Sequence, residues 1–134
     1  MTRLLLDTSA YSALFRGDPD AKEVLASADL VHLNPVVIGE LLAGFGLGRR
    51  RDKNLRELDD FLSSARVKVV PIDEETSSRY AAIVAGLRAA GTPIPTNDVW
   101  IAASAMQHGF EVVTADAHFS KVPQVVVRLL RPAA

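Results

Sequence analysis

The hydrophobic positions of this chain fall into short, nearly continuous runs separated by longer amphipathic stretches. The runs cover residues 3–6, 30–33, 67–72, 112–114 and 125–127, and they are rich in Leu, Val and Ile. A strand that is apolar at consecutive positions is typically buried on both faces, as strands of a parallel sheet are. We therefore predict a set of short, buried strands at these positions.

The stretches between the runs carry signals for the ends of helices. Helices are predicted over residues 8–15, from Pro19 after Asp18, from Pro35, over 50–64, from Asp73 to Gly91, and over 97–107 before Gly109. Three glycines, Gly44, Gly46 and Gly48, are expected to break the helix that begins at Pro35. Alternating strands and helices predict an α/β fold with three layers, α/β/α, around a central, mostly parallel sheet. We expect one domain spanning residues 1–134.

Composition excludes several classes of protein. The net charge of -1 and the pI of about 6.3 do not mark the whole chain as a nucleic-acid binder. The chain has no cysteine, which excludes disulfides and thiolate metal sites. No apolar stretch approaches the roughly 20 residues that span a bilayer, and the run at residues 4–6 is too short for a signal peptide. We expect a soluble, cytoplasmic protein with no membrane partner.

Four carboxylates stand beside apolar residues that are expected to form the core. Asp7 ends the first run, Glu40 lies within the helix after Pro35, Asp98 opens a later helix, and Asp116 follows the run at 112–114. A buried carboxylate is costly unless a partner pairs with it or a metal binds it. Ligands of open α/β sheets collect at the carboxyl ends of the strands, where Asp7 and Asp116 are expected. The pattern predicts a site for a divalent cation.

Three of these four residues also have a routine structural explanation. Asp7 is a plausible helix cap before Thr8 and Ser9, Asp98 is favoured in a first helical turn by the helix dipole, and Asp116 suits a turn. Glu40 has no routine structural role, because aliphatic residues flank it. A purely structural explanation requires four independent coincidences, so the metal site is favoured for the group.

Four blocks of the sequence resemble a known family. The blocks LLLDTSAYSALF, PVVIGELLAG, PTNDVWIAASAMQHG and VVTADAHFSKV are similar, in order and spacing, to the signature regions of PIN-domain ribonucleases. The resemblance runs from about Leu4 to Val127 and is closest to the small VapC toxins of VapBC toxin–antitoxin pairs. It implies a PIN-like fold. All four acidic positions of the family pattern are occupied here, by Asp7, Glu40, Asp98 and Asp116. The resemblance also implies an endoribonuclease that cleaves RNA, a cognate antitoxin that blocks the cleft, and a homodimer or a higher toxin–antitoxin assembly.

The donor set predicts the kind of metal. Carboxylate oxygens, without cysteine or a histidine cluster, suit Mg²⁺ or Mn²⁺ rather than zinc. By the resemblance, Asp7, Asp98 and Asp116 would bind the ion, and Glu40 would bind it through water or orient the nucleophile. Candidate donors around these acids are Thr8, Ser9, Asn97 and Thr114, each equally acceptable as a cap or turn residue.

A basic segment is a candidate for binding the RNA backbone. It contains Arg49, Arg50, Arg51, Lys53 and Arg56 against a single acid, Asp52. In a helix, Arg49, Lys53 and Arg56 would share one face, opposite leucines. Such a run is, for any one residue, more often only a solvated face, but as a group it forms a plausible phosphate-binding edge.

Histidines carry less information. We interpret His32 and His108 as structural, and the sequence does not favour a substrate contact for His118, although it lies two residues after Asp116.

Other families share parts of the pattern. A haloacid-dehalogenase-like phosphatase would need an aspartate where Ser9 stands, and a response-receiver domain would give no reason for Glu40. A non-catalytic module of the same fold, binding RNA or protein, is the remaining alternative.

Overall fold

The structure, a computed structural model, describes residues 1–132 and contains a five-stranded parallel sheet. The strands are β1 (Arg3–Leu6), β2 (Leu30–Leu33), β3 (Val67–Val69), β4 (Glu111–Thr114) and β5 (Val126–Leu129). Their order in the sheet is β3-β2-β1-β4-β5, with every neighbouring pair parallel. The predicted α/β class and parallel sheet are confirmed.

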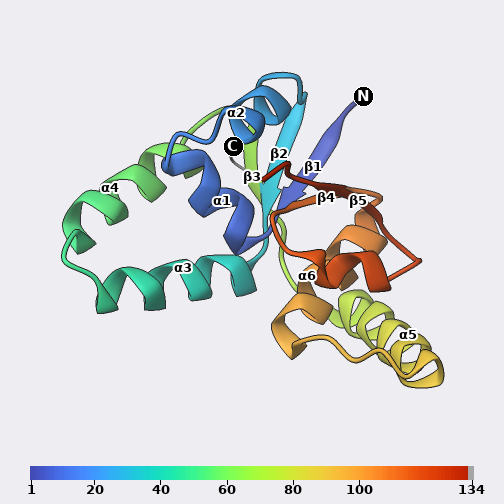
Figure 1. Ribbon diagram of the computed structural model, residues 1–134. Helices are drawn as coiled ribbons and strands as arrows, with labels where there is room; N and C mark the ends of the chain where they lie inside the picture. The colour runs from blue at the N-terminus through green and yellow to red at the C-terminus, as the bar shows by residue number, and fades with distance from the viewer. Residues whose placement is uncertain (133–134) are drawn as a thin grey trace.

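Helices pack on both sides of this sheet (Figure 1). They are α1 (Thr8–Phe15), α2 (Pro19–Ala26), α3 (Pro35–Leu47), α4 (Arg51–Leu62), α5 (Glu74–Ala90) and α6 (Thr96–His108), together with the short 3₁₀ helix η1 (Ala117–Lys121). In Figure 1, α1 to α4 lie on one side and α5 and α6 on the other. None of the helices within residues 1–132 is long and apolar enough to cross a bilayer.

The central strands form the core. Leu4, Leu5 and Leu6 of β1 are fully buried, and so are Val112 and Val113 of β4. Burial at consecutive positions, which face opposite sides of a sheet, means that both faces are covered. Burial on both faces of the sheet explains why the strands are apolar at consecutive positions in the sequence.

Capping residues stand at the starts and ends of helices at the positions that the sequence predicts. The side chain of Asp18 accepts a hydrogen bond from the backbone of Ala21, and Asp73 forms a capping box with Thr76 at the start of α5. The helices α5 and α6 are followed by Gly91 and Gly109, whose φ angles of 68° and 72° lie in the left-handed region. Glycine adopts this conformation without the steric cost that other residues incur.

Three predicted boundaries are wrong. The last strand, predicted over residues 125–127, is shifted and extended, because β5 spans Val126–Leu129. Gly44 and Gly46 do not break the helix after Pro35, because α3 continues to Leu47 and only Gly48 stands at its end. Glycine in a helix costs about 1 kcal/mol, which packing can outweigh. Leu41 of α3 is buried and Phe45 packs against the core.

The third strand is also shorter than predicted, since β3 ends at Val69 instead of residue 72. The backbone N–H of Val70 still donates to the carbonyl of Leu33, at 2.9 Å. Pro71 follows and has no N–H, so it cannot continue the ladder.

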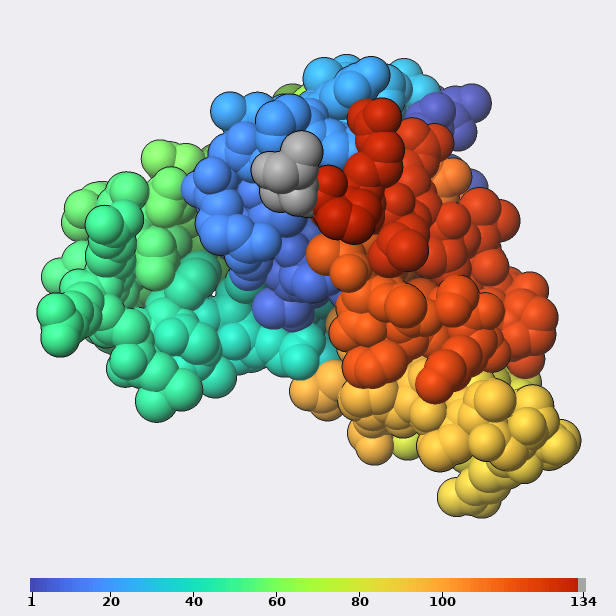
Figure 2. Space-filling view, in the orientation of Figure 1, coloured from blue at the N-terminus to red at the C-terminus, as the bar shows by residue number. Residues whose placement is uncertain are grey.

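Two helical parts project from the body of the molecule. In Figure 2 the α3–α4 pair, in teal and green, extends to one side, and α5, in yellow, extends to the other. The outline of the molecule is hollowed between them, below the ends of the central strands.

Candidate active site

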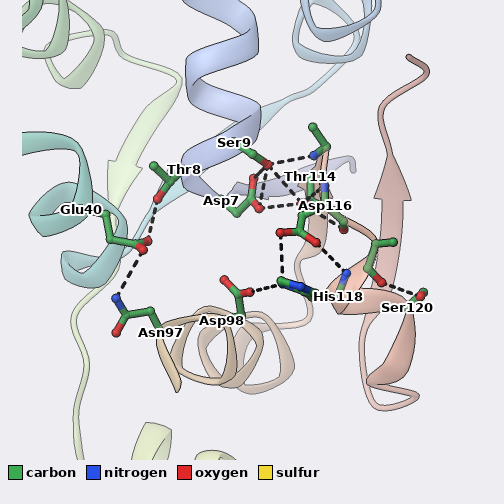
Figure 3. Close-up of polar contacts among 12 residues, drawn as sticks. Asp7, Thr8, Ser9, Glu40, Asn97, Asp98, Thr114, Asp116, His118 and Ser120 are labelled. Atoms are coloured by element: carbon green, nitrogen blue, oxygen red, sulfur yellow. Dashed lines mark hydrogen bonds and ion pairs between the residues drawn. The ribbon is translucent and has the colours of Figure 1, made fainter. Parts of the chain in front are cut away.

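The predicted acids meet where the winding of the sheet reverses. The chain starts at β1 in the centre, adds β2 and β3 on one side, and then adds β4 and β5 on the other. Crevices at the carboxyl ends of strands form at such a reversal, between β1 and β4 here. Figure 3 shows the side chains of Asp7, Glu40, Asp98 and Asp116 around one central space. They come from the end of β1, from α3, from α6 and from the segment after β4.

Asp7 is both a helix cap and a member of this group. It is 4% exposed, and its carboxylate accepts hydrogen bonds from the backbone of Ala10 at 2.8 Å and from Ser9 Oγ at 2.7 Å. Thr114 Oγ1 donates to it at 2.6 Å. Burial raises the pKa of Asp7; these hydrogen bonds oppose the rise, and the negative charge of Asp98 adds to it. The structural and functional explanations of this residue are therefore compatible.

The hydroxyl of Thr114 links the ends of β1 and β4. Thr114 is fully buried, and its Oγ1 donates to Asp7 and accepts from the backbone N–H of Asp116 at 2.9 Å. Asp116 begins η1 by accepting from the backbone N–H of His118, also at 2.9 Å. One buried hydroxyl thus fixes the relative positions of two of the acids.

Asp98 lies in the first turn of α6 and contacts the group from the opposite side. Its side chain is 17% exposed, and its Oδ2 lies 3.0 Å from His118 Nδ1. Burial raises the pKa of Asp98, the contact with His118 opposes this, and the negative charges of Asp116 and Glu40 raise it further. Asp98 is therefore close enough to the other acids for their charges to repel. A bound cation would offset this repulsion.

Glu40 is held at the edge of the group by two side chains. Thr8 Oγ1 donates to its Oε1 at 2.7 Å, and Asn97 Nδ2 donates to its Oε2 at 3.3 Å. These contacts tie α3 to the starts of α1 and α6. Together with Ser9 and Thr114, all four polar residues predicted to surround the acids make hydrogen bonds to them.

His118 is a member of the site that sequence reasoning did not favour. Its Nδ1 lies 3.0 Å from Asp98 Oδ2 and 3.1 Å from Asp116 Oδ2. Ligand atoms of these three residues all lie within 4.8 Å of one another. In residues 1–132, Asp7 and Glu40 are not part of this tightest group. The only signal in the sequence was the two-residue spacing from Asp116, which does not show which way the ring points.

The other two histidines lie away from the acids. His32 is buried in β2, where its Nδ1 contacts the carbonyl oxygen of Leu4 at 2.9 Å and its ring stacks on Phe110. His108 is the last residue of α6, and its ring also stacks on Phe110. These contacts agree with the structural role predicted for both.

The basic segment lies at the outer end of the α3–α4 pair. Arg49, Arg50, Arg51, Lys53 and Arg56 are all exposed. Because α4 begins at Arg51, Arg49 precedes the helix and does not share its face with Lys53 and Arg56, contrary to the prediction. Arg50 and Lys53 line a surface cavity of ≈ 250 Å³ together with Arg16 and the rings of Tyr11, Phe15 and Phe45. In Figure 1 the turn between α3 and α4 lies far from α6, the helix that carries Asp98.

Comparisons with known proteins agree with this geometry. The family model "PIN domain" matches residues 4–125. The chain is 34% identical to "Ribonuclease VapC4" of Mycobacterium tuberculosis over 127 residues, which cover 93% of this chain and 95% of the relative. It is 34% identical to "VapC ribonuclease Y4jK" of Sinorhizobium fredii, over 84% of this chain and 86% of the relative.

Solved structures show the same fold. A chain of VapBC2 from Rickettsia felis, solved bound to a promoter DNA fragment, superposes with a TM-score of 0.84 at 22% identity, covering 97% of this chain and all of that one (100%). A chain of FitAcB from Neisseria gonorrhoeae superposes with a TM-score of 0.74 at 29% identity, covering 92% and 95%. With the fold, the acidic group and the family match in agreement, the chain belongs to the PIN domain family.

Proposed function

We propose that this chain is a divalent-metal-dependent endoribonuclease that acts as the toxin of a toxin–antitoxin pair. One observation carries the proposal: four carboxylates from four separate segments surround one space (Figure 3) in a chain whose relatives are named VapC ribonucleases. These names and the four acids together support cleavage of RNA as the reaction.

The donors present fit a divalent cation. Asp98 and Asp116 have carboxylate oxygens within 4.8 Å of each other, a separation at which two charges repel by about 3.5 kcal/mol at an effective dielectric of 20. The charges of Glu40 and Asp116 and burial all disfavour ionised Asp98. A cation reverses each of these unfavourable terms, and carboxylate oxygens suit Mg²⁺ or Mn²⁺.

Each acid has a proposed role. Asp98 and Asp116 would bind the ion directly. Asp7, oriented by Ser9 and Thr114, would add a further negative charge close to the ion. When bound, a divalent ion would acidify water and stabilise the charge that develops on a phosphodiester during hydrolysis. Glu40 lies across the central space from Asp116 (Figure 3), where Thr8 and Asn97 fix its carboxylate so that it could orient a water molecule for attack.

Basic residues on the α3–α4 pair would bind the RNA backbone at a distance from the cleavage point. The cavity lined by Arg16, Arg50 and Lys53 has three cationic side chains beside aromatic rings. Cations bind phosphates, and aromatic rings stack on unpaired bases. We propose that Arg49, Arg51 and Arg56, which are exposed nearby, extend this contact.

The proposed partners are an antitoxin and a second copy of the chain. Exposed apolar side chains lie on α1 and α3: Phe15, Leu42 and Leu47, which are 38%, 45% and 92% exposed. Related structures are of VapBC and FitAB complexes. We propose that a cognate antitoxin covers these residues and the acidic cleft in the cytoplasm, and that the toxin forms homodimers.

Expression in a bacterial host tests the function. The chain is expected to arrest growth and to produce discrete RNA fragments, and Asp98→Asn is expected to abolish both. Asp60→Asn is the matched control, because Asp60 is an exposed acid of α4 that lies outside the acidic group. Growth arrest that persists in Asp98→Asn, with no change in the RNA, would instead indicate a non-catalytic binding module.

A further inference from the structure

We infer that His118 is a direct ligand of the metal in this chain, and that its nitrogen makes the site favour Mn²⁺ over Mg²⁺. This inference rests on the proposed function, because it concerns the ion held by Asp98 and Asp116. It goes further by adding a nitrogen donor to a site that sequence reasoning assigned only oxygen donors.

The position of the ring is the first support. His118 Nδ1 lies between two carboxylates from different elements, 3.0 Å from Asp98 Oδ2 on α6 and 3.1 Å from Asp116 Oδ2 before η1 (Figure 3). In octahedral coordination with bonds of about 2.1 Å, neighbouring ligand atoms are about 3 Å apart. The two nitrogen–oxygen separations therefore match those of adjacent ligands around one ion.

The local backbone holds the ring in this place. His118 donates its backbone N–H to Asp116, and the next residue, Phe119, is fully buried. Successive residues of a 3₁₀ helix point about 120° apart, so anchoring Phe119 in the core fixes the direction of its neighbour. Val122, buried after η1, anchors the other end. The ring is thus aimed at the acids and remains 41% exposed, accessible to an ion from solvent.

The contacts of the ring nitrogens are also compatible with binding a metal. Within residues 1–132, the contacts of Nδ1 are with the two proposed ligands, Asp98 and Asp116, and Nε2 has no hydrogen bond to the protein. Within the described part of the chain, Nδ1 therefore contacts only the proposed ligands, so an ion bound between them would take Nδ1 from no other partner. His32 is different, because the carbonyl of Leu4 engages its Nδ1.

The chemistry of the donors gives the preference for the ion. Mg²⁺ is bound almost entirely through oxygen, whereas imidazole binds first-row transition ions. A site with two carboxylates and one imidazole is suited to Mn²⁺, which accepts both kinds of donor. An all-oxygen site built from the acids alone would discriminate less between the two ions.

Electron paramagnetic resonance of bound Mn²⁺ provides a test that does not depend on activity. The purified protein, loaded with Mn²⁺, is expected to show electron spin echo modulation from a directly bound ¹⁴N, which changes to the ¹⁵N pattern when histidine is labelled. His118→Gln is expected to lose this signal, and His108→Gln, the control at the end of α6, to retain it. Calorimetry is expected to show that His118→Gln weakens Mn²⁺ binding by about tenfold or more with little change for Mg²⁺.

The possible outcomes separate this inference from the proposed function. Mn²⁺ that binds with no nitrogen coupling would overturn the role of His118 and leave a carboxylate site intact. An equal loss of Mn²⁺ and Mg²⁺ affinity in His118→Gln would overturn the preference. No binding of either ion to the folded wild-type protein would contradict the metal site itself and, with it, the proposed function.

Discussion

Replacing Thr114 by valine tests the buried hydrogen bonds on which the site depends. Valine has nearly the same shape and the same branching as threonine, so the change removes the hydroxyl with little effect on packing. Thr114 Oγ1 donates to Asp7 at 2.6 Å and accepts from the backbone N–H of Asp116 at 2.9 Å. The variant would leave a buried carboxylate with one donor fewer and a backbone N–H without its acceptor.

The size of the effect follows from these two contacts. A hydrogen bond to a charged group contributes about 1.5–3 kcal/mol, and an unsatisfied buried donor costs about 1–3 kcal/mol. Ser9 and Ala10 continue to bind Asp7, which limits the loss. We expect Thr114→Val to lower the free energy of unfolding by about 2–3 kcal/mol above neutral pH, a large part of the about 5–15 kcal/mol typical of a domain.

The effect should also depend on pH. The hydrogen bond from Thr114 favours the ionised form of Asp7, while burial holds the folded-state pKa of Asp7 above its ordinary value. The contribution of the bond is therefore present where Asp7 is ionised and declines as the pH falls through that raised pKa. The destabilisation should be smaller at about pH 4 than at about pH 8.

Urea unfolding with EDTA present, at both pH values, measures this directly. Thr92→Val is the matched control, since Thr92 is half-buried and lies just after α5, outside the acidic group. A loss below about 0.5 kcal/mol, or the same loss at both pH values, would refute the reasoning, because surface substitutions commonly fall in that range.

Further predictions concern charge, glycine and the core. In metal-free protein, Asp98→Asn should raise the free energy of unfolding by on the order of 1 kcal/mol near neutral pH, because the pKa of Asp98 is raised and its ionisation is unfavourable in the fold. The gain in stability should shrink on acidification. A loss of stability at neutral pH, measured by denaturant titration, would contradict this prediction. Gly46→Ala should stabilise by about 0.5–1 kcal/mol, since Gly46 is in a helix with space for a Cβ. Gly91→Ala has equal space but a φ of 68°, and should destabilise by about 1–2 kcal/mol in the same assay. Phe119→Ala should lower the free energy of unfolding by about 3–5 kcal/mol, measured in urea, because Phe119, a residue of η1, is fully buried.

Local signals made the fold predictable. Caps such as Asp18 and Asp73, and glycines such as Gly91, act on their immediate neighbours, so they specify the ends of helices without knowledge of the rest of the chain. The prediction was wrong where tertiary packing decides the outcome. Gly44 and Gly46 weaken α3 locally, but the contacts of its apolar face keep the helix intact.

Similar reasoning explains which parts of the site were found. Asp7 and Asp116 follow strands that lie side by side, so the topology alone brings them together. His118 could not be assigned in the same way, because its position depends on how η1 turns around the buried Phe119. The distance between the basic segment and the acids likewise depends on the direction in which α3 leaves the body, which the sequence does not contain.

The central claim is that the acidic group cleaves RNA with the help of a divalent ion, and cleavage by the purified protein tests it most directly. Wild-type protein should cut cellular RNA into discrete fragments with Mg²⁺ or Mn²⁺, stop when EDTA is added, and resume when the ion is restored. Asp98→Asn and Asp7→Asn should be inactive while remaining folded. Cleavage that is unchanged in EDTA and in both variants, or no cleavage by folded wild-type protein with either ion, would contradict the account.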